Sequence, residues 1–173
     1  LKYFKTPKHW KDLWDPKYKG NLLLMDDPRE VFAIALLSLG YSPNDSDLTH
    51  IKKAYERLIA LKDNIKLITS NTVQALMIDE DLLIGMSWNN DLIKVNQENK
   101  EVNLHFPSEG FALWVDCLSI LKDPPHEKEA YQFINFLLDN TNAIAAQSIE
   151  KIPNTNLLAG KLLPAPAIKP MPH

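Results

Sequence analysis

Three carboxylates and two indoles stand out among the residues that could do chemistry. They are Asp27 and Glu30 in the segment DDPRE, Trp88 in MSWNN, and Trp114 and Asp116 in LWVDC. Carboxylates pair with ammonium groups, and indole faces attract both cations and CH surfaces. A charge-assisted bond contributes about 1.5–3 kcal/mol and a cation–indole contact about 0.5–2 kcal/mol. A few contacts of each kind are therefore enough for micromolar binding. A polyamine, a small organic cation with methylene groups, fits these residue types.

The same residues also have structural interpretations. Asp27 followed by Pro28 and then Glu30 matches the start of a capped helix, so both carboxylates could serve as capping groups alone. The two tryptophans could simply pack in a core, as tryptophan mostly does. Asp116 stands inside the apolar run FALWVDCLSI, where a buried carboxylate needs a partner or a ligand. The residues by themselves leave both interpretations open.

Two enzyme interpretations compete with a binding site. The three carboxylates could cleave a glycoside, or Cys117 and His105 could act as nucleophile and base. Neither has a supporting motif, and in a strand Cys117 points away from the face that carries Asp116. The five histidines lack metal-ligand spacing, a lone cysteine argues against zinc, and no glycine-rich phosphate loop exists. A binding protein without cofactor or metal is therefore favoured over an enzyme.

Composition excludes further classes. The 173 residues are 45% hydrophobic and 24% charged, which is ordinary for one globular domain. With 19 basic and 22 acidic residues and no basic stripe, nucleic acid is not an expected partner. No apolar stretch reaches the roughly 18 residues of a membrane span. Because the chain begins at Leu1 without a signal-like segment, we expect any export signal to have been removed or never to have existed.

Apolar periodicity and breaker residues predict the elements that must position these side chains. Predicted strands are 21–25, 66–68, 82–88, 102–106 and 111–120. Predicted helices are 28–39, ended by Gly40, then 47–61, 72–78, 89–100 (exposed), 127–138 and 141–149. Residues 1–20 are expected to be irregular apart from one helical turn near 9–14. The alternation predicts an α/β layer structure with mainly parallel strands.

In open α/β sheets, ligands collect beyond the carboxyl ends of the strands. The acidic pair Asp27 and Glu30 follows the first strand, and Trp88 ends the strand 82–88. Trp114 and Asp116 would share one face of the strand 111–120, because side chains alternate along a strand. Position in the predicted sheet therefore favours a common site.

Longer segments carry a more specific signal. LWDPKYKGNLLLMDDPREVFAIALLSLGYS, IGMSWN, FPSEGFALWVDCLSI, INFLLDN and NLLAGKLL follow one another between about residues 10 and 163. Together they resemble the bacterial spermidine/putrescine-binding proteins, the periplasmic receptors of ABC importers for polyamines. The resemblance implies a two-lobed, type II periplasmic binding fold that closes on a polyamine, without catalysis, cofactor or obligatory metal. It also implies a membrane permease as partner.

The resemblance implies roles for the candidate residues. Asp27 and Glu30 look like the acidic pair that binds an amino group, and Trp88 like the cleft tryptophan that packs on methylenes. Trp114 and Asp116 look like the paired indole and amine-binding carboxylate. Where the family commonly has a ligand-contacting tyrosine before a PTPN-like stretch, this chain has Ile152 ahead of Pro153 and Asn154, so the resemblance implies that this contact is lost. A sugar or other solute stays open as an alternative ligand, and a carboxylate-based hydrolase is the alternative of another class.

By the resemblance, residues 1–112 form the second lobe, residues 113–163 cross the hinge and return to the first lobe, and residues 164–173 form a proline-rich tail. We therefore expect an incomplete fragment of such a receptor. The strand near 114–120 and the helix after it would then lack most of the lobe on which they pack. Exposed apolar surface of this kind favours self-association or domain exchange.

Overall fold

The computed structural model describes residues 7–79, 82, 84–150 and 156–162. Two compact units make up the chain, residues 1–114 and residues 115–173, and each is described by itself. The proline-rich tail and the stretch from Ile152 to Asn154 lie outside the described residues. The assignment of these stretches to the lobes of a receptor stays a prediction.

The first unit is built on a small sheet of three parallel strands. The strands are β1 (Leu22–Leu24), β2 (Ile65–Ile68) and β3 (Ile84–Gly85), in the order β2-β1-β3. Leu22 of the central strand aligns with Ile65 on one side and with Ile84 on the other. The predicted α/β class and the parallel pairing are confirmed, although β3 is shorter than the strand predicted over 82–88.

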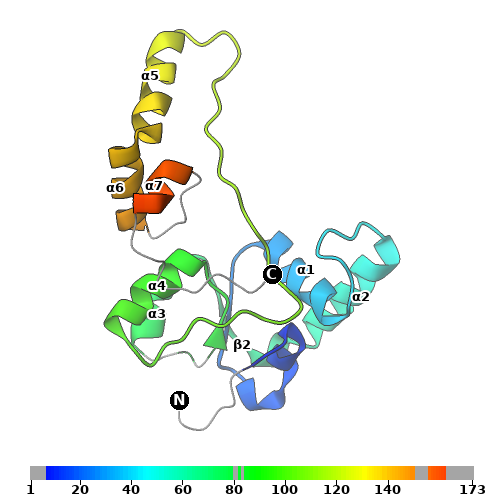
Figure 1. The fold of residues 1–173 in the computed structure, drawn as a ribbon. Coiled ribbons are helices and arrows are strands. Elements are labelled where there is room, and N and C mark those ends of the chain that lie inside the picture. The colour runs from blue at the N-terminus through cyan, green and yellow to red at the C-terminus, as the bar shows by residue number, and fades with distance from the viewer. Residues whose placement is uncertain (1–6, 80–81, 83, 151–155, 163–173) are drawn as a thin grey trace. The chain divides into compact units, whose positions relative to one another are not determined.

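Helices lie on both sides of this sheet (Figure 1). They are α1 (Pro28–Ser38), α2 (Leu48–Ile59), α3 (Val73–Ile78) and α4 (Asn89–Glu98), with α1 packed on α2 and α3 on α4. The unit also contains three short 3-10 helices, η1 (Trp10–Trp14), η2 (Pro16–Tyr18) and η3 (Lys62–Asn64). The helical turn predicted near residues 9–14 is therefore confirmed.

The central strand divides its side chains between two cores. Leu22 and Leu24 join a cluster with Leu13, Ile34 and Met86, whereas Leu23 joins the cluster formed by buried residues of α3 and α4. This division follows from the two-residue period of a strand. Because both faces are covered, all three leucines are buried, and the strand reads as a continuous apolar run.

The end of α1 shows why its boundary could be predicted. Gly40 takes a positive φ of 80°, its amide donates to the carbonyl of Leu37, and the Tyr41 amide donates to the carbonyl of Leu36. These two bonds form the Schellman arrangement that satisfies carbonyls at a helix end. A glycine adopts this left-handed conformation without steric cost.

Two strand predictions were wrong. Residues 102–106 and 111–120 have no regular structure, because their backbones pair with no other strand among the described residues. In the first of these segments, Val102 and Leu104 still pack on the α3–α4 core, so the alternation reflects burial without pairing. The second segment is almost entirely exposed. Alternating side chains alone do not make a strand, which needs a hydrogen-bonded neighbour.

The prediction of an exposed helix after Trp88 was half right. The helix is present as α4, but Leu92 and Val95 are buried in it. These residues lie three positions apart, which places them on one face of a helix and turns that face to the core. The polar composition of the segment concealed this narrow apolar face.

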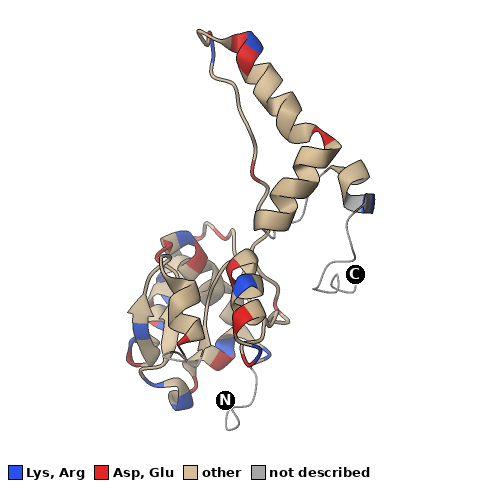
Figure 2. Ribbon diagram, turned by 90° about the vertical axis from the view of Figure 1, so that its left-hand side faces the viewer, with Lys and Arg blue, Asp and Glu red and all other residues tan. Residues whose placement is uncertain are grey.

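The second unit consists of α5 (Glu127–Leu138), α6 (Asn140–Glu150) and α7 (Leu157–Leu162). The first two were predicted, whereas α7 was not. In α5 the charged residues Glu127, Lys128 and Glu129 stand at the start of the helix, and its later turns carry no charge (Figure 2). No residue of α5 is buried, and Tyr131, Phe133 and Phe136 are exposed. The amphipathic face predicted for this helix is therefore only partly covered within the described part of its unit, because Ala130, Ile134 and Leu137 are partly buried where α5 packs on α6.

Within the described ranges, no helix combines the length and apolar character needed to cross a membrane. The same ranges hold no group of three or more His, Cys, Asp or Glu side chains that could bind a metal ion.

Gly85 is expected to tolerate no side chain. An added Cβ would lie 2.9 Å from the Cβ of Leu23 on the neighbouring strand and 2.7 Å from the Cε of Met77. The end of Met77 can move, but the Leu23 Cβ belongs to the central strand and cannot. Gly85→Ala should lower the free energy of unfolding by about 1–3 kcal/mol, the usual cost of overpacking. Urea denaturation measures this, and an unchanged midpoint would contradict the close approach of the two strands.

Candidate functional site

Asp27 both caps a helix and keeps a free oxygen. Its Oδ1 accepts hydrogen bonds from the amides of Arg29 at 2.9 Å and Glu30 at 3.3 Å at the start of α1. The predicted capping role is therefore confirmed. The Oδ2 atom accepts no hydrogen bond from any described residue, so the same carboxylate can still pair with a cation. The capping and binding interpretations are compatible for this residue.

Glu30 is a buried carboxylate, with only 7% of its surface exposed. Burial raises the pKa of the Glu30 carboxyl, the negative charge of Asp27 raises it further, and Arg29 opposes this more weakly. The reciprocal bond of a capping box, which the Asp27 amide would donate to the Glu30 carboxylate, is absent among the described hydrogen bonds. Capping by Glu30 is therefore not observed. A bound cation would offset the free-energy cost of ionising this buried carboxyl beside another carboxylate.

The two tryptophans lie against each other. The rings of Trp88 and Trp114 have centroids 5.9 Å apart at an interplanar angle of 78°, an edge-to-face arrangement. Trp88 is partly buried and packs on the core cluster around Leu24 and Met86. Trp114 is 49% exposed, so core packing does not account for it. An exposed indole beside a half-buried one leaves aromatic surface available to a ligand.

The acidic pair and Trp88 leave the sheet at the same edge. The strands β1 and β3 run parallel, and the amide of Met86 donates to the carbonyl of Leu23 at 3.0 Å. Asp27 and Glu30 follow β1, and Trp88 follows β3 by three residues. Parallel register therefore brings the carboxyl ends of both strands, where α/β proteins bind ligands, to one place.

Asp116 does not occupy the position that the sequence predicted. It is exposed in the second unit, in a segment that forms no strand, and the argument from a buried carboxylate fails. The neighbouring Cys117 is exposed as well, rather than a small core residue. An unpaired backbone has no fixed alternation of faces, so the shared strand face of Trp114 and Asp116 was wrong. A binding role for Asp116 stays a prediction.

One polar group at this edge was missed. The hydroxyl of Ser87, directly before Trp88, is buried and has no hydrogen-bond partner among the described residues. A buried hydroxyl without a partner is uncommon in folded proteins. Sequence carried no signal for it, because the isolation of a side chain depends on its neighbours in space.

Comparison with known proteins decides the family. The family model for bacterial extracellular solute-binding proteins matches residues 2–159. The chain belongs to this family. It is a family of solute-binding transport proteins and not a family of enzymes.

Within this family, the chain is similar to proteins named for polyamine binding. The spermidine/putrescine-binding periplasmic protein 1 of Haemophilus influenzae is 36% identical over 166 residues, which cover 93% of this chain and 46% of the relative. The spermidine/putrescine-binding periplasmic protein of Escherichia coli is 38% identical over 161 residues, covering 92% and 46%. The resemblance seen in the sequence is confirmed. The chain spans about half the length of the curated relatives it matches.

Solved structures show the same fold. A spermidine/putrescine ABC transporter substrate-binding protein from Streptococcus pneumoniae matches with a TM-score of 0.80 and 34% identity, over 93% of this chain and 50% of that protein. A putative spermidine/putrescine ABC transporter protein from Listeria monocytogenes matches with a TM-score of 0.86 and 32% identity, over 92% and 49%. The predicted α/β fold of the periplasmic binding proteins is therefore confirmed.

Glu30→Gln is expected to stabilise the unliganded protein near neutral pH. The folded state raises the pKa of Glu30, so it binds this proton more readily than the unfolded state does. The carboxylate consequently costs stability once the pH rises above the ordinary value of a glutamate, and the cost is complete above the raised pKa. Thermal midpoints of both proteins should coincide at low pH and separate as the pH rises.

Glu56→Gln is the matched control, because Glu56 is an exposed glutamate of α2. It should leave the midpoint nearly unchanged across the same pH range. A loss of stability in Glu30→Gln at neutral pH would contradict a carboxylate strained by burial.

Proposed function

We propose that this chain contributes to a polyamine-binding site of the spermidine/putrescine type. Asp27 and Glu30 pair with an ammonium group, while Trp88 and Trp114 line the path of the methylene groups. The observation that carries the proposal is the buried Glu30 beside Asp27, at the sheet edge where Trp88 also emerges. The names of the relatives give the same ligand class.

The charges favour a cation over a neutral solute. Two neighbouring carboxylates repel each other, and burial increases the cost of ionising Glu30. A bound ammonium group would offset both effects at once, whereas a sugar hydroxyl would offset neither. The indole pair alone could serve a sugar, but it also suits alkyl chains and cations. The acidic pair therefore selects the polyamine.

Asp116 is proposed to bind a second ammonium group. It is an exposed carboxylate two residues after Trp114. A polyamine carries its charges at intervals along one chain, so separate carboxylates suit successive nitrogens. The site needs neither metal nor cofactor, and we propose no catalysis for it.

The names of the relatives suggest the role of the complete protein. Their names describe periplasmic binding proteins and an ABC transporter. We propose that the complete protein captures a polyamine in the periplasm and delivers it to the membrane permease of an ABC importer. Residues 1–112 would belong to the second lobe of such a receptor, and residues 113–163 would cross the hinge and return to the first lobe.

Calorimetry with spermidine and putrescine tests the site. Measurements should use this chain and a chimera that adds the remaining half of the Escherichia coli relative. We expect micromolar or tighter binding by the chimera and weaker or no binding by the chain alone. Asp27→Asn and Glu30→Gln in the chimera should each weaken binding roughly ten- to hundredfold, since a charge-assisted bond contributes about 1.5–3 kcal/mol.

The variants separate binding from folding. Asparagine caps a helix about as well as aspartate, so Asp27→Asn removes the charge without removing the cap. Glu30→Gln should weaken binding while it stabilises the unliganded protein, and Glu56→Gln should change neither. Binding of a neutral sugar, or polyamine affinity that is indifferent to both site variants, would overturn the proposal.

The chain is also expected to self-associate. Val115, Leu118 and Leu121 are exposed in the second unit, and so are Phe133 and Phe136 of α5. Exposed apolar surface of this kind marks a contact with further protein. In a complete receptor, the rest of the first lobe would cover it; for this chain alone, we propose that a second copy does so by association or domain exchange.

Analytical ultracentrifugation of the 173-residue chain measures the association. A dimer or larger species that dissociates on dilution is expected, and Phe133→Glu combined with Phe136→Glu should shift the protein toward the monomer. Tyr55→Glu changes an exposed aromatic residue of α2 in the first unit and should have no such effect. A strictly monomeric mass at every concentration would contradict the proposal.

A further inference from the structure

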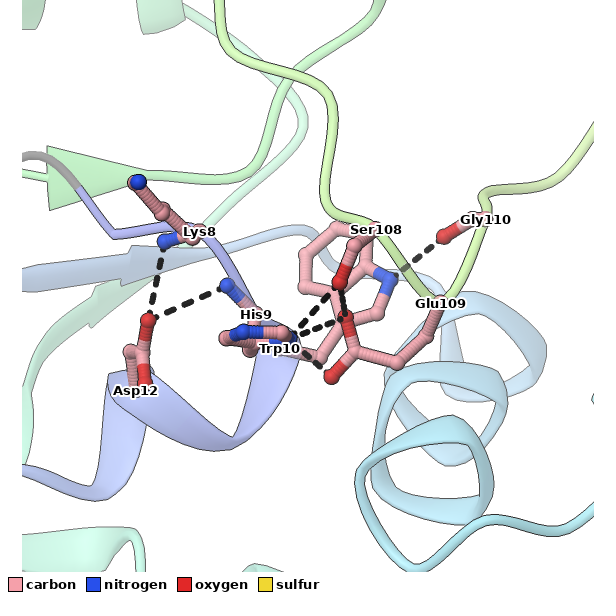
Figure 3. A network of polar contacts seen from close by, with 7 residues as sticks. All are labelled: Lys8, His9, Trp10, Asp12, Ser108, Glu109 and Gly110. Atoms are coloured by element: carbon pink, nitrogen blue, oxygen red, sulfur yellow. Dashed lines mark hydrogen bonds and ion pairs between the residues drawn. The ribbon is translucent and has the colours of Figure 1, made fainter.

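A cluster of polar contacts joins two segments of the first unit that are about a hundred residues apart in the sequence (Figure 3). The amide of Trp10 donates to Oε1 of Glu109 at 3.1 Å, and the indole Nε1 of Trp10 donates to the carbonyl of Gly110 at 2.7 Å. The Ser108 amide donates to the carbonyl of Lys8 at 3.0 Å. These contacts, between Lys8–Trp10 and Ser108–Gly110, are called the turn clamp below.

Side chains reinforce the turn clamp. The Ser108 hydroxyl lies 2.7 Å from Nδ1 of His9 and donates to Oε2 of Glu109 at 3.1 Å. The same His9 nitrogen lies 3.4 Å from Oε2 of Glu109. His9, Trp10, Ser108 and Glu109 therefore each have at least two contacts across or within the turn. Several bonds shared among few groups restrain the turn more than any one bond would.

The turn itself is well defined. The Gly110 amide donates to the carbonyl of Pro107 at 3.1 Å, and Gly110 has a positive φ of 95°, which a glycine adopts readily. The rings of Phe106 and Phe111, on either side of the turn, have centroids 4.9 Å apart. Beyond Phe111, no backbone hydrogen bond holds residues 112–114 within the described part of the chain. The turn clamp is thus the last fixed point before Trp114.

Trp10 and Trp88 pack against the same hydrophobic core cluster. Both pack on the core cluster that contains Leu22, Leu24 and Met86. Trp114 meets Trp88 four residues after the turn that Trp10 holds. The position of the exposed indole relative to the half-buried one therefore depends on where Trp10 places Gly110.

We propose that Trp10 and Glu109 are positioning residues, which fix the 107–110 turn and so hold the Trp114 indole edge-on against Trp88. Their effect on a ligand rests on the polyamine site proposed above, whereas their effect on the two indoles is a property of the unliganded chain. The sequence gives no hint of this role, because Trp10 lies about a hundred residues before Glu109 in the chain and only folding brings the two together.

Trp10→Phe tests the proposal, with Trp14→Phe as a matched control. Phenylalanine keeps an aromatic ring in the core but cannot donate the indole hydrogen bond. Trp14 lies in the same short helix and donates an equally short bond, 2.7 Å, to the carbonyl of Arg57 in α2. The control therefore loses the same kind of bond without touching the 107–110 turn.

Two readouts need no ligand. The chain has four tryptophans, and single Trp→Phe variants assign their indole N–H signals by NMR. Trp10→Phe should shift or broaden the Trp88 and Trp114 signals and speed amide hydrogen exchange at residues 108–110, while Trp14→Phe should do neither. Glu109→Ala should reproduce the Trp10→Phe effect, and Glu109→Gln, which keeps an oxygen acceptor, should restore the wild-type signals.

Binding provides a third readout, in the chimera with the remaining half of the Escherichia coli relative. Trp10→Phe should weaken spermidine binding about two- to tenfold, the worth of one neutral hydrogen bond, relative to Trp14→Phe. The proposed positioning role of Trp10 and Glu109 would be overturned if the Trp88 and Trp114 signals responded alike to both Trp→Phe variants. It would also be overturned if these signals did not respond to Glu109→Ala. If those signals respond as expected but no form binds polyamine, the turn clamp stands and the proposed function fails.

Discussion

The first unit depends on the alternation of three leucines in its central strand. Leu22 and Leu24 point to one core and Leu23 to the other, so apolar cover is needed on both faces of the sheet. Paired helices supply that cover, α1 with α2 and α3 with α4. A sheet covered on both faces is the usual setting of parallel strands. Parallel strands in turn bring their carboxyl ends, and the residues that follow them, to one edge.

That edge holds groups whose placement is unfavourable without a ligand. The Glu30 carboxylate is buried beside another carboxylate, and the Ser87 hydroxyl is buried without a partner among the residues that the structure describes. Trp114 leaves half of its surface exposed. Arrangements of this kind lower stability and are common where a protein binds something. Asp27 shows how capping and binding can be combined, because one oxygen caps α1 while the other accepts no hydrogen bond from a described residue.

Local chemistry explains which predictions succeeded. Asp27 and Pro28 mark the start of α1 and Gly40 marks its end, and each acts on backbone groups within a few residues. Asp47 caps α2 in the same way. The strand at Leu22–Leu24 was predictable because an unbroken apolar run between polar residues has few alternatives. The ordered segments that resemble the polyamine-binding proteins then identified the family, which the comparisons confirm.

By itself, the sequence determined the helices α1 to α6, the strands of the small sheet, the parallel α/β class, the family, and the capping position of Asp27. Only the tertiary structure decided that residues 111–120 form no strand, that Asp116 is exposed, that Glu30 is buried, and that Trp10 holds the turn before Trp114. The physical reason is how far apart in the sequence the interacting groups lie. Caps, turns and periodicity depend on neighbours in the chain, whereas pairing, burial and the raised pKa of a carboxylate depend on groups that only folding brings together.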